Sequence, residues 1–288
     1  MSTSPVSPQR RNPWLLLLLT LFPPLAHLWI GHALRGCILA GGLLAAAASM
    51  GWSGVIHEPS GLLAMAGVMV FGLLVIEGDA LILNFRSRGR SRPYAHGWIM
   101  LLAIPAYLAL RVFLGPLLLG FNLYTIPSMS MAPTLLPGDL ILTDDRPIHA
   151  GLIQRGRAAV LVPPHRPSIV YVQRIVGLEG DRVQLIDGVL WVNGVRINEP
   201  YLSTHRSPRA VNFRNFGPVV VPAGTFLTMG DNRDNSEDGR VFGPVPVANI
   251  RAFPTWIIHA QRDERTGIDP GFDQGQAFAG AAQAKQGR

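Results

Sequence analysis

The apolar residues of this chain are concentrated in its first part. Up to residue 121, long runs of Leu, Ala, Val, Ile and Gly exceed what the core helix of a soluble domain needs. Four runs reach the roughly 20 residues that a helix needs to cross the hydrocarbon of a bilayer. They lie at about 14–34, 36–56, 61–84 and 97–119. We therefore expect residues 1–121 to form an α-helical membrane region with three to four apolar helical segments.

The first apolar run is open to two interpretations. Pro23 and Pro24 interrupt it, so the run either crosses the membrane fully or forms a re-entrant or interfacial hairpin. It lacks the small-residue cleavage site of a secretory signal peptide, so we expect it to be retained. His27 and His32 are either interfacial or functional groups inside the membrane.

Positive charge indicates how the chain is oriented. The densest cluster of arginines, at Arg86, Arg88, Arg90 and Arg92, lies between two apolar runs. Because short cytoplasmic loops carry the excess of Lys and Arg, this loop is predicted to be cytoplasmic. Everything after the 97–119 segment is then extracytoplasmic, which suits a multi-pass membrane protein.

The pattern changes at about residue 122 to short runs of β-forming residues broken by Gly, Pro and Asp. Asp187-Gly188 and Asn193-Gly194 are typical two-residue hairpin turns. Strands are predicted at 139–143, 158–162, 168–176, 181–186, 189–193, 219–221, 225–229 and 253–258. Residues 122–259 are thus expected to form a mainly-β, antiparallel domain.

The last part of the chain, residues 260–288, is rich in Gly, Ala and Gln and has no hydrophobic period. Such a composition offers little apolar surface to bury, so the tail is predicted to be disordered.

Composition excludes several other classes of protein. The net charge of +7 is not arranged as a basic patch interleaved with aromatic residues, so no nucleic-acid partner is expected. The one cysteine, Cys37, lies in an apolar run and cannot form an intrachain disulfide. The cysteine and scattered histidines give no metal-ligand spacing, so we expect no metal and no cofactor.

Two serines follow the last membrane segment in the stretch IPSMSMAPTLLPGDLIL, residues 126–142. Ser128 and Ser130 are separated by one residue and flanked by Pro127 and Pro133. The stretch is either a proline-bounded loop whose hydroxyls bond the backbone, or a cluster of reactive hydroxyls.

A second polar cluster, MGDNRDNSEDGRVFGPV, occupies residues 229–245. It is consistent with a solvated turn or with an EF-hand calcium loop, whose opening fits Asp234, Ser236, Asp238 and Gly239. The calcium interpretation is disfavoured because the twelfth position is Val245 instead of a bidentate Glu, and because the flanks have a β pattern.

A third stretch, YVQRIVGLEGDRV at residues 171–183, has the pattern of a strand followed by a Gly-Asp turn. Together the three stretches, in this order and behind a membrane anchor, resemble the signal peptidase I family over roughly residues 97–258. The resemblance implies a β catalytic domain at the membrane surface, a Ser/Lys dyad, and cleavage of signal sequences from exported preproteins after small side chains. Membrane lipid is the other expected partner.

The resemblance also implies roles for individual residues. Ser130 matches the nucleophile, and Ser128 matches the hydroxyl that completes the oxyanion hole with the Ser130 backbone N–H. In the polar cluster, Ser236 matches the serine that orients the catalytic amine, and Asp238 and Arg240 match an ion pair that braces the site. The neighbouring Asp231, Asn232 and Arg233 match the same scaffold.

The general base of the family is missing from this sequence. Gln173 stands where the resemblance implies a lysine, directly before Arg174, and the only lysine is Lys285 in the tail. An amide nitrogen has no basic lone pair, and an arginine does not give up its proton in proteins. Three further departures from the family pattern are Arg157, Glu179 and Gly239.

Three hypotheses follow for the function. The chain is an active serine endopeptidase with another base, for which His149, His165 and His205 are the candidates in the β domain. Alternatively, it is a catalytically silent homologue that binds signal sequences or assists another peptidase. In the third, it is an ordinary peptidase in which Gln173 is a recent or engineered substitution.

Overall fold

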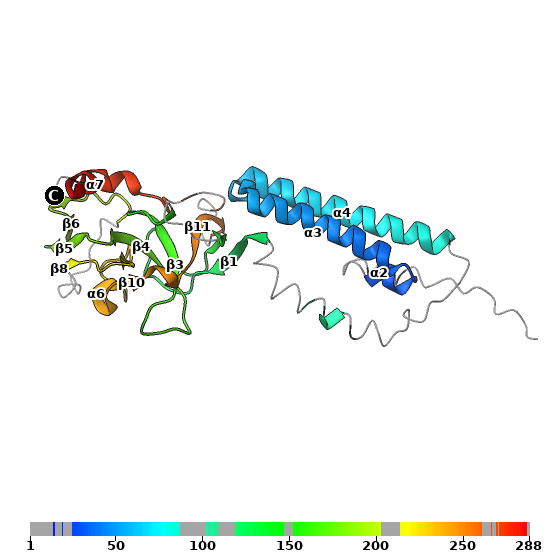
Figure 1. The fold of residues 1–288 in the computed structure, drawn as a ribbon, viewed down its shortest axis with the longest axis horizontal. Helices are drawn as coiled ribbons and strands as arrows, with labels where there is room; N and C mark the ends of the chain where they lie inside the picture. Colours follow the sequence, from blue (N-terminus) through cyan, green and yellow to red (C-terminus); the bar gives the residue numbers. More distant parts are fainter. Residues whose placement is uncertain are drawn as a thin grey trace, which may run out of the picture. The chain divides into compact units, whose positions relative to one another are not determined.

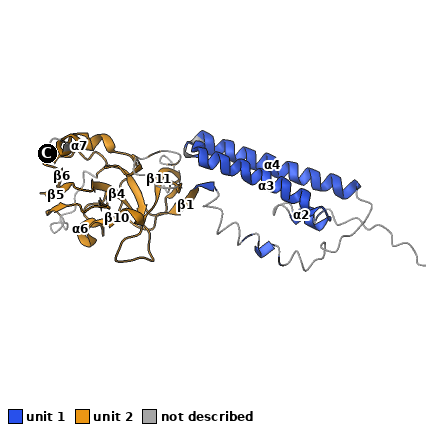
Figure 2. Cartoon of the chain, in the orientation of Figure 1, with its two compact units in different colours: residues 1–120 blue, residues 121–288 orange. Residues whose placement is uncertain are grey.

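The chain folds into two compact units, Met1–Gly120 and Phe121–Arg288 (Figure 2). The computed structural model describes residues 14, 19, 25–86, 102, 104–106, 108, 119–146, 152–202, 214–260, 266, 269 and 271–286. The first unit is helical and the second is mainly β, as the hydrophobic pattern predicts.

The helical unit is built around two long apolar helices (Figure 1). α3 spans Ala33–Ser53 and α4 spans Pro59–Arg86. Gly54 ends α3 with a left-handed φ of 83°, which glycine adopts without a steric penalty, and Pro59 opens α4. Both helices are long and apolar enough to cross a membrane. They correspond to the predicted segments 36–56 and 61–84.

The first predicted segment, 14–34, is not one continuous helix. The short helix α2, Leu25–Trp29, ends before Gly31, whose φ of 89° separates it from α3. The residues Pro23 and Pro24 lie outside the described part of the chain, as does most of the predicted segment 97–119.

A group of three charged and polar side chains joins the three helices of this unit. Asp79 of α4 accepts hydrogen bonds from Arg35 of α3 at 2.8 and 2.5 Å, and His27 Nε2 of α2 lies 2.9 Å from the same carboxylate. Because the arginine and the carboxylate offset each other's charge, the cluster can exist among apolar helices. It fastens α2 to the two long helices.

The second unit consists of two antiparallel sheets. The larger sheet has the order β1-β2-β11-β3-β4-β9-β10, and the smaller has the order β7-β6-β5-β8. The strands of the larger sheet are β1 Phe121–Thr125, β2 Leu140–Asp144, β3 Ala158–Leu161, β4 Tyr171–Leu178, β9 Thr225–Met229, β10 Val245–Pro246 and β11 Ile250–His259. Those of the smaller sheet are β5 Arg182–Ile186, β6 Val189–Val192, β7 Val195–Arg196 and β8 Phe216–Val220.

The long strand β11 curls the larger sheet. It pairs with β2 along one part and with β3 along another, and its register shifts in both pairings. Such shifts bend a strand and strengthen its twist. The two predicted hairpin turns are confirmed, since Asp187 and Asn193 have left-handed φ angles of 50° and 55° before Gly188 and Gly194.

The predicted disorder of the tail is wrong for residues 271–286. These residues form the 3-10 helix η6, Gly275–Phe278, and the helix α7, Ala279–Gln286. Phe272, Phe278 and Ala281 are buried in the cores of the β unit. The composition of the tail is poor in apolar residues, yet two buried aromatic rings and backbone hydrogen bonds, such as that from Ala158 N to the Phe272 carbonyl at 2.8 Å, attach it to the domain.

Candidate active site

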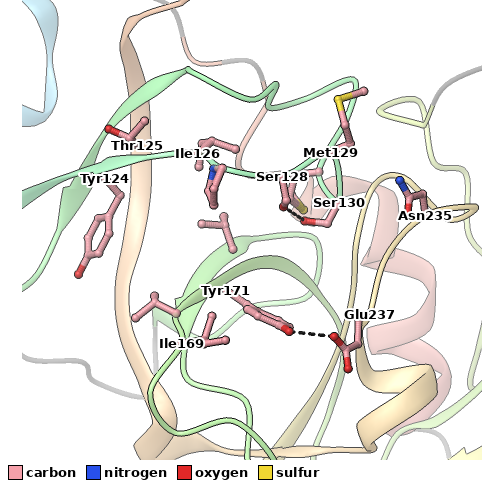
Figure 3. A pocket seen from close by; sticks show the side chains of 14 residues that line it. Tyr124, Thr125, Ile126, Ser128, Met129, Ser130, Ile169, Tyr171, Asn235 and Glu237 are labelled. Atoms are coloured by element: carbon pink, nitrogen blue, oxygen red, sulfur yellow. Dashed lines mark hydrogen bonds between the residues drawn. The ribbon is translucent and has the colours of Figure 1, made fainter.

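The two predicted serines lie in the loop that joins β1 to β2. Backbone hydrogen bonds close the base of this loop, from Ile126 N to the Asp139 carbonyl at 2.9 Å and from Gly138 N to the Ile126 carbonyl at 2.8 Å. The hydroxyls of Ser128 and Ser130 lie 3.0 Å apart and hydrogen-bond each other (Figure 3). Among the described residues this is the one side-chain hydrogen bond of Ser130.

A cavity of about 390 Å³ opens beside the serines. Figure 3 shows Ser128 and Ser130 on one wall, and Tyr171 with Glu237 on the wall that faces them. Apolar side chains line much of the remainder, including those of Ile126, Met131, Ile169, Val170 and Val172. The serine pair therefore borders a cavity that is lined largely by apolar side chains.

The polar cluster 229–245 holds the serine loop in place. Asn232 donates its backbone N–H to the Ser130 carbonyl at 3.0 Å and its side-chain amide to the Met129 carbonyl at 3.0 Å. A Cβ on Gly230 would lie 2.2 Å from Ser236 Oγ and 2.4 Å from the Ser130 carbonyl oxygen. Only glycine permits this close approach of the two loops.

Asp238 and Arg240 form the predicted ion pair. Arg240 donates from Nε and Nη2 to the two carboxylate oxygens of Asp238, both at 2.8 Å. Asp238 also caps the short helix α6, Gly239–Phe242, and accepts the Gly230 N–H at 2.9 Å. Since these bonds occupy the carboxylate, it is not arranged as a calcium ligand. The described residues contain no group of three or more His, Cys, Asp or Glu side chains that could hold a metal.

A second ion pair connects the serine loop to strand β4. Arg174 is 0% exposed and donates to Asp231 Oδ1 at 2.8 Å and to Asp231 Oδ2 at 2.7 Å. Thr134, in the serine loop, donates to the same carboxylate at 2.5 Å. The Arg174 guanidinium also lies 4.1 Å from the ring centre of Tyr201. The pairing outweighs the effect of burial, so the pKa of Arg174 is raised and the group stays charged.

Gln173 lies on β4 beside this ion pair and is 1% exposed. Its Nε2 donates to the Glu237 carbonyl at 2.7 Å, and its Oε1 accepts from the Thr228 hydroxyl at 2.6 Å. Both ends of the amide are therefore satisfied. Ser236, next to Glu237, is 8% exposed, and its hydroxyl has no hydrogen-bond partner in the described part of the chain.

Comparison with known proteins identifies the family. The family model described as signal peptidase, peptidase S26, matches residues 95–257, which is more than half of the chain. The chain belongs to the signal peptidase family. The signal peptidase I of Bacillus licheniformis is 38% identical over 149 residues, covering 50% of this chain and 76% of the relative. The signal peptidase I T of Bacillus subtilis (strain 168) is 35% identical over 148 residues, covering 50% and 73%.

Among solved structures, the chain is similar to a crystal structure of a signal peptidase I from Enterococcus faecalis V583. The match has 28% identity and a TM-score of 0.32, and it covers 35% of this chain and 95% of that one.

The structure describes one of the three histidines that are candidates for a substitute base. His165 Nε2 lies 3.2 Å from Glu237 Oε1, and its ring stacks on Phe242 at a centroid distance of 5.0 Å. Tyr171 donates to Glu237 Oε2 at 3.0 Å. This hydrogen bond is the main cause that lowers the pKa of Glu237, which is also paired with Arg166. His149 and His205 lie outside the described residues.

The three further departures from the family pattern have structural roles. Arg157 donates to the Leu152 carbonyl at 3.2 Å and lies over the ring of Phe253, and burial lowers its pKa. Glu179 accepts the Gly224 N–H at 2.9 Å. A Cβ on Gly239 would lie 2.6 Å from the Thr228 carbonyl oxygen, so the backbone approach at α6 favours glycine. The local sequence offered no sign of these contacts.

Proposed function

We propose that this member of the signal peptidase family is a membrane-bound serine endopeptidase that removes signal sequences from exported preproteins. Ser130 is the nucleophile, and Ser128 with the Ser130 backbone N–H supplies the oxyanion hole. The observation that carries the proposal is the pair of hydroxyls, 3.0 Å apart, on the wall of a cavity of about 390 Å³. Ser236, at the place that the family uses to orient the catalytic amine, and the ion pair of Asp238 and Arg240 support the site from the polar cluster.

The chemistry begins with attack of Ser130 Oγ on the carbonyl carbon of the scissile peptide bond. The carbonyl oxygen gains negative charge, which hydrogen bonds from Ser128 and the Ser130 N–H stabilise. The serine proton must pass to a base and then to the leaving amine. Gln173 cannot accept it, because its amide nitrogen carries no basic lone pair and already donates to the Glu237 carbonyl. Cleavage by this chain therefore requires another acceptor, for which the three histidines named above are the candidates.

A second function is favoured by the environment of Gln173. Since both ends of the amide are hydrogen-bonded inside the protein, the residue fits its surroundings without any catalytic partner. This favours a homologue that binds signal sequences in the same cavity without cleaving them, or assists another peptidase. The unpartnered hydroxyl of Ser236 favours the endopeptidase instead, because the family uses this serine to orient an amine.

One experiment separates the two functions. Purified full-length protein in detergent is incubated with a preprotein, and cleavage and binding of the signal sequence are measured for the natural chain and for Ser130→Ala. The endopeptidase predicts cleavage that Ser130→Ala abolishes. Binding without cleavage in both forms identifies the silent homologue, and neither binding nor cleavage contradicts both proposals.

The orientation in the membrane belongs to the same proposal. The catalytic unit lies on the extracytoplasmic side of a bacterial plasma membrane, and the arginine-rich loop 86–92 lies in the cytoplasm. Single cysteines are introduced as Arg90→Cys or Ala210→Cys in a Cys37→Ser background. An impermeant thiol reagent on intact cells is expected to label position 210 and spare position 90, and the reverse result contradicts the orientation.

A further inference from the structure

The segment after the family match carries contacts to the site that the proposed function does not use. The match ends at residue 257, and the described residues beyond it include 271–286, here called the C-terminal segment. In sequence this segment lies about 100 residues from the strand that carries Gln173, yet it contacts that strand and the core beneath the serine loop.

The backbone of the C-terminal segment holds Arg174. Arg174 Nη1 donates to the carbonyls of Gly271 and Phe272 at 3.0 and 3.1 Å, and to the Gly156 carbonyl at 2.7 Å. Its other nitrogens hold Asp231. The buried guanidinium is therefore fixed on one side by the C-terminal segment and on the other by the polar cluster. Because Arg174 directly follows Gln173, the segment sets the position of the strand at the base site.

The side chain of Phe272 supports the other half of the site. It is 2% exposed and belongs to the same buried cluster as Ile126, Met131 and Leu135. In the loop, Ile126 precedes the two serines, and Met131 and Leu135 follow them. Aromatic rings contribute large contact areas to a core, and removing one leaves a cavity into which its neighbours shift.

A second aromatic residue of the segment, Phe278, packs in a different part of the core. Phe278 packs with Ala281 in the cluster formed by Val183, Leu190 and Leu227, which contains none of the proposed site residues. Asn193 donates to the Ala281 carbonyl at 3.1 Å, and Lys285 donates to the Glu179 carbonyl. Phe278 thus anchors the segment to the core of the smaller sheet, whereas the buried cluster of Phe272 includes residues that flank the two serines in the loop.

We infer that Phe272 is a positioning residue, through which the C-terminal segment sets the geometry between the Ser130 loop and the strand position 173. Its ring supports the serine loop, and its carbonyl, with that of Gly271, fixes Arg174. The expected effect of Phe272 on catalysis rests on the proposed function. Its expected effect on the loop rests on packing alone. Phe278 provides the matched control, because it is an equally buried Phe in the same segment.

The experiment compares Phe272→Ala with Phe278→Ala in the full-length protein. Amide hydrogen exchange is measured first, since it needs no activity. We expect Phe272→Ala to accelerate exchange in residues 126–135 and 171–175, and Phe278→Ala to accelerate it in the strands of the smaller sheet instead. Equal acceleration by both variants, or none at 126–135 in Phe272→Ala, overturns the inference.

Preprotein cleavage is the second measurement. Phe272→Ala is expected to lower kcat by about 10- to 100-fold with little change in KM, because a displaced nucleophile reduces turnover without removing the binding cavity. Phe272→Leu should retain most of the kcat of the natural chain. If Phe272→Ala fails to fold, Phe272→Leu is measured in its place. Equal losses of kcat in the Phe272 and Phe278 variants contradict the positioning role. If the natural chain does not cleave, the proposed function fails, and the exchange measurement alone decides the inference.

Discussion

The two halves of the candidate site differ in what surrounds them. Ser128 and Ser130 border a cavity and are exposed or half-buried, and their hydroxyls bond each other. Gln173 is buried, and its amide is held by Thr228 and Glu237. Under the proposed function, the nucleophile half is open to a substrate, whereas the base half, at Gln173, is closed as a neutral part of the core.

The sharpest test of this contrast is to restore an amine at the base position. We expect Gln173→Lys to raise preprotein cleavage by at least about 10²-fold, which is the lower range of what a positioned general base contributes. Burial lowers the pKa of a lysine, and the hydroxyls of Thr228 and Ser236 are available to orient the amine. The rate should rise with pH as the amine loses its proton.

The controls are Gln173→Met, which has a similar size and no base, and the double variant Gln173→Lys/Ser130→Ala. Neither should gain activity. Strong cleavage by the natural chain that Gln173→Lys leaves unchanged would show that another base already serves Ser130. A correctly folded Gln173→Lys protein that cleaves nothing would show that the serine half is impaired as well.

The same contrast explains what the sequence could and could not predict. The serine loop and the polar cluster are local motifs, so the sequence alone is enough to select their residues as candidates. The partners of Gln173 lie 55 and 64 residues away, and no local pattern reveals them. The hairpin turns were predictable because Asp-Gly and Asn-Gly suit left-handed backbone angles. The folded tail was not, because Phe272 and Phe278 are single aromatic residues in a polar context.

The ion pair between the two halves should be the main source of stability at the site. Asp231→Asn leaves the buried guanidinium of Arg174 without its carboxylate, and breaking a buried pair costs about 3–5 kcal/mol. Glu237→Gln, which breaks the exposed pair with Arg166, should cost less than about 1 kcal/mol. Urea unfolding of the detergent-solubilised protein measures both. Equal losses would show that Asp231 does not connect the halves.

Alkaline pH should weaken the base half through Tyr201. Burial, followed by the charge of Glu199, raises the pKa of Tyr201 well above its usual value of about 10. The unfolded chain then loses the phenolic proton before the folded chain does, so stability falls as the pH rises above about 10. Tyr201→Phe should reduce this fall, measured as the urea midpoint between pH 8 and pH 11. An identical fall in both proteins would assign it to other groups.

The smallest expected effect concerns the outer edge of the base half. His165 contacts Glu237 and Phe242 on the wall that faces the serines, and the described residues show no hydrogen bond between His165 and Ser130. Its pairing with an exposed carboxylate is worth at most about 1 kcal/mol, so His165→Ala should change kcat/KM by less than about fivefold. The pH dependence of cleavage should keep its midpoint. A loss of about 10²-fold together with a shifted midpoint would instead identify His165 as the base that replaces the missing lysine.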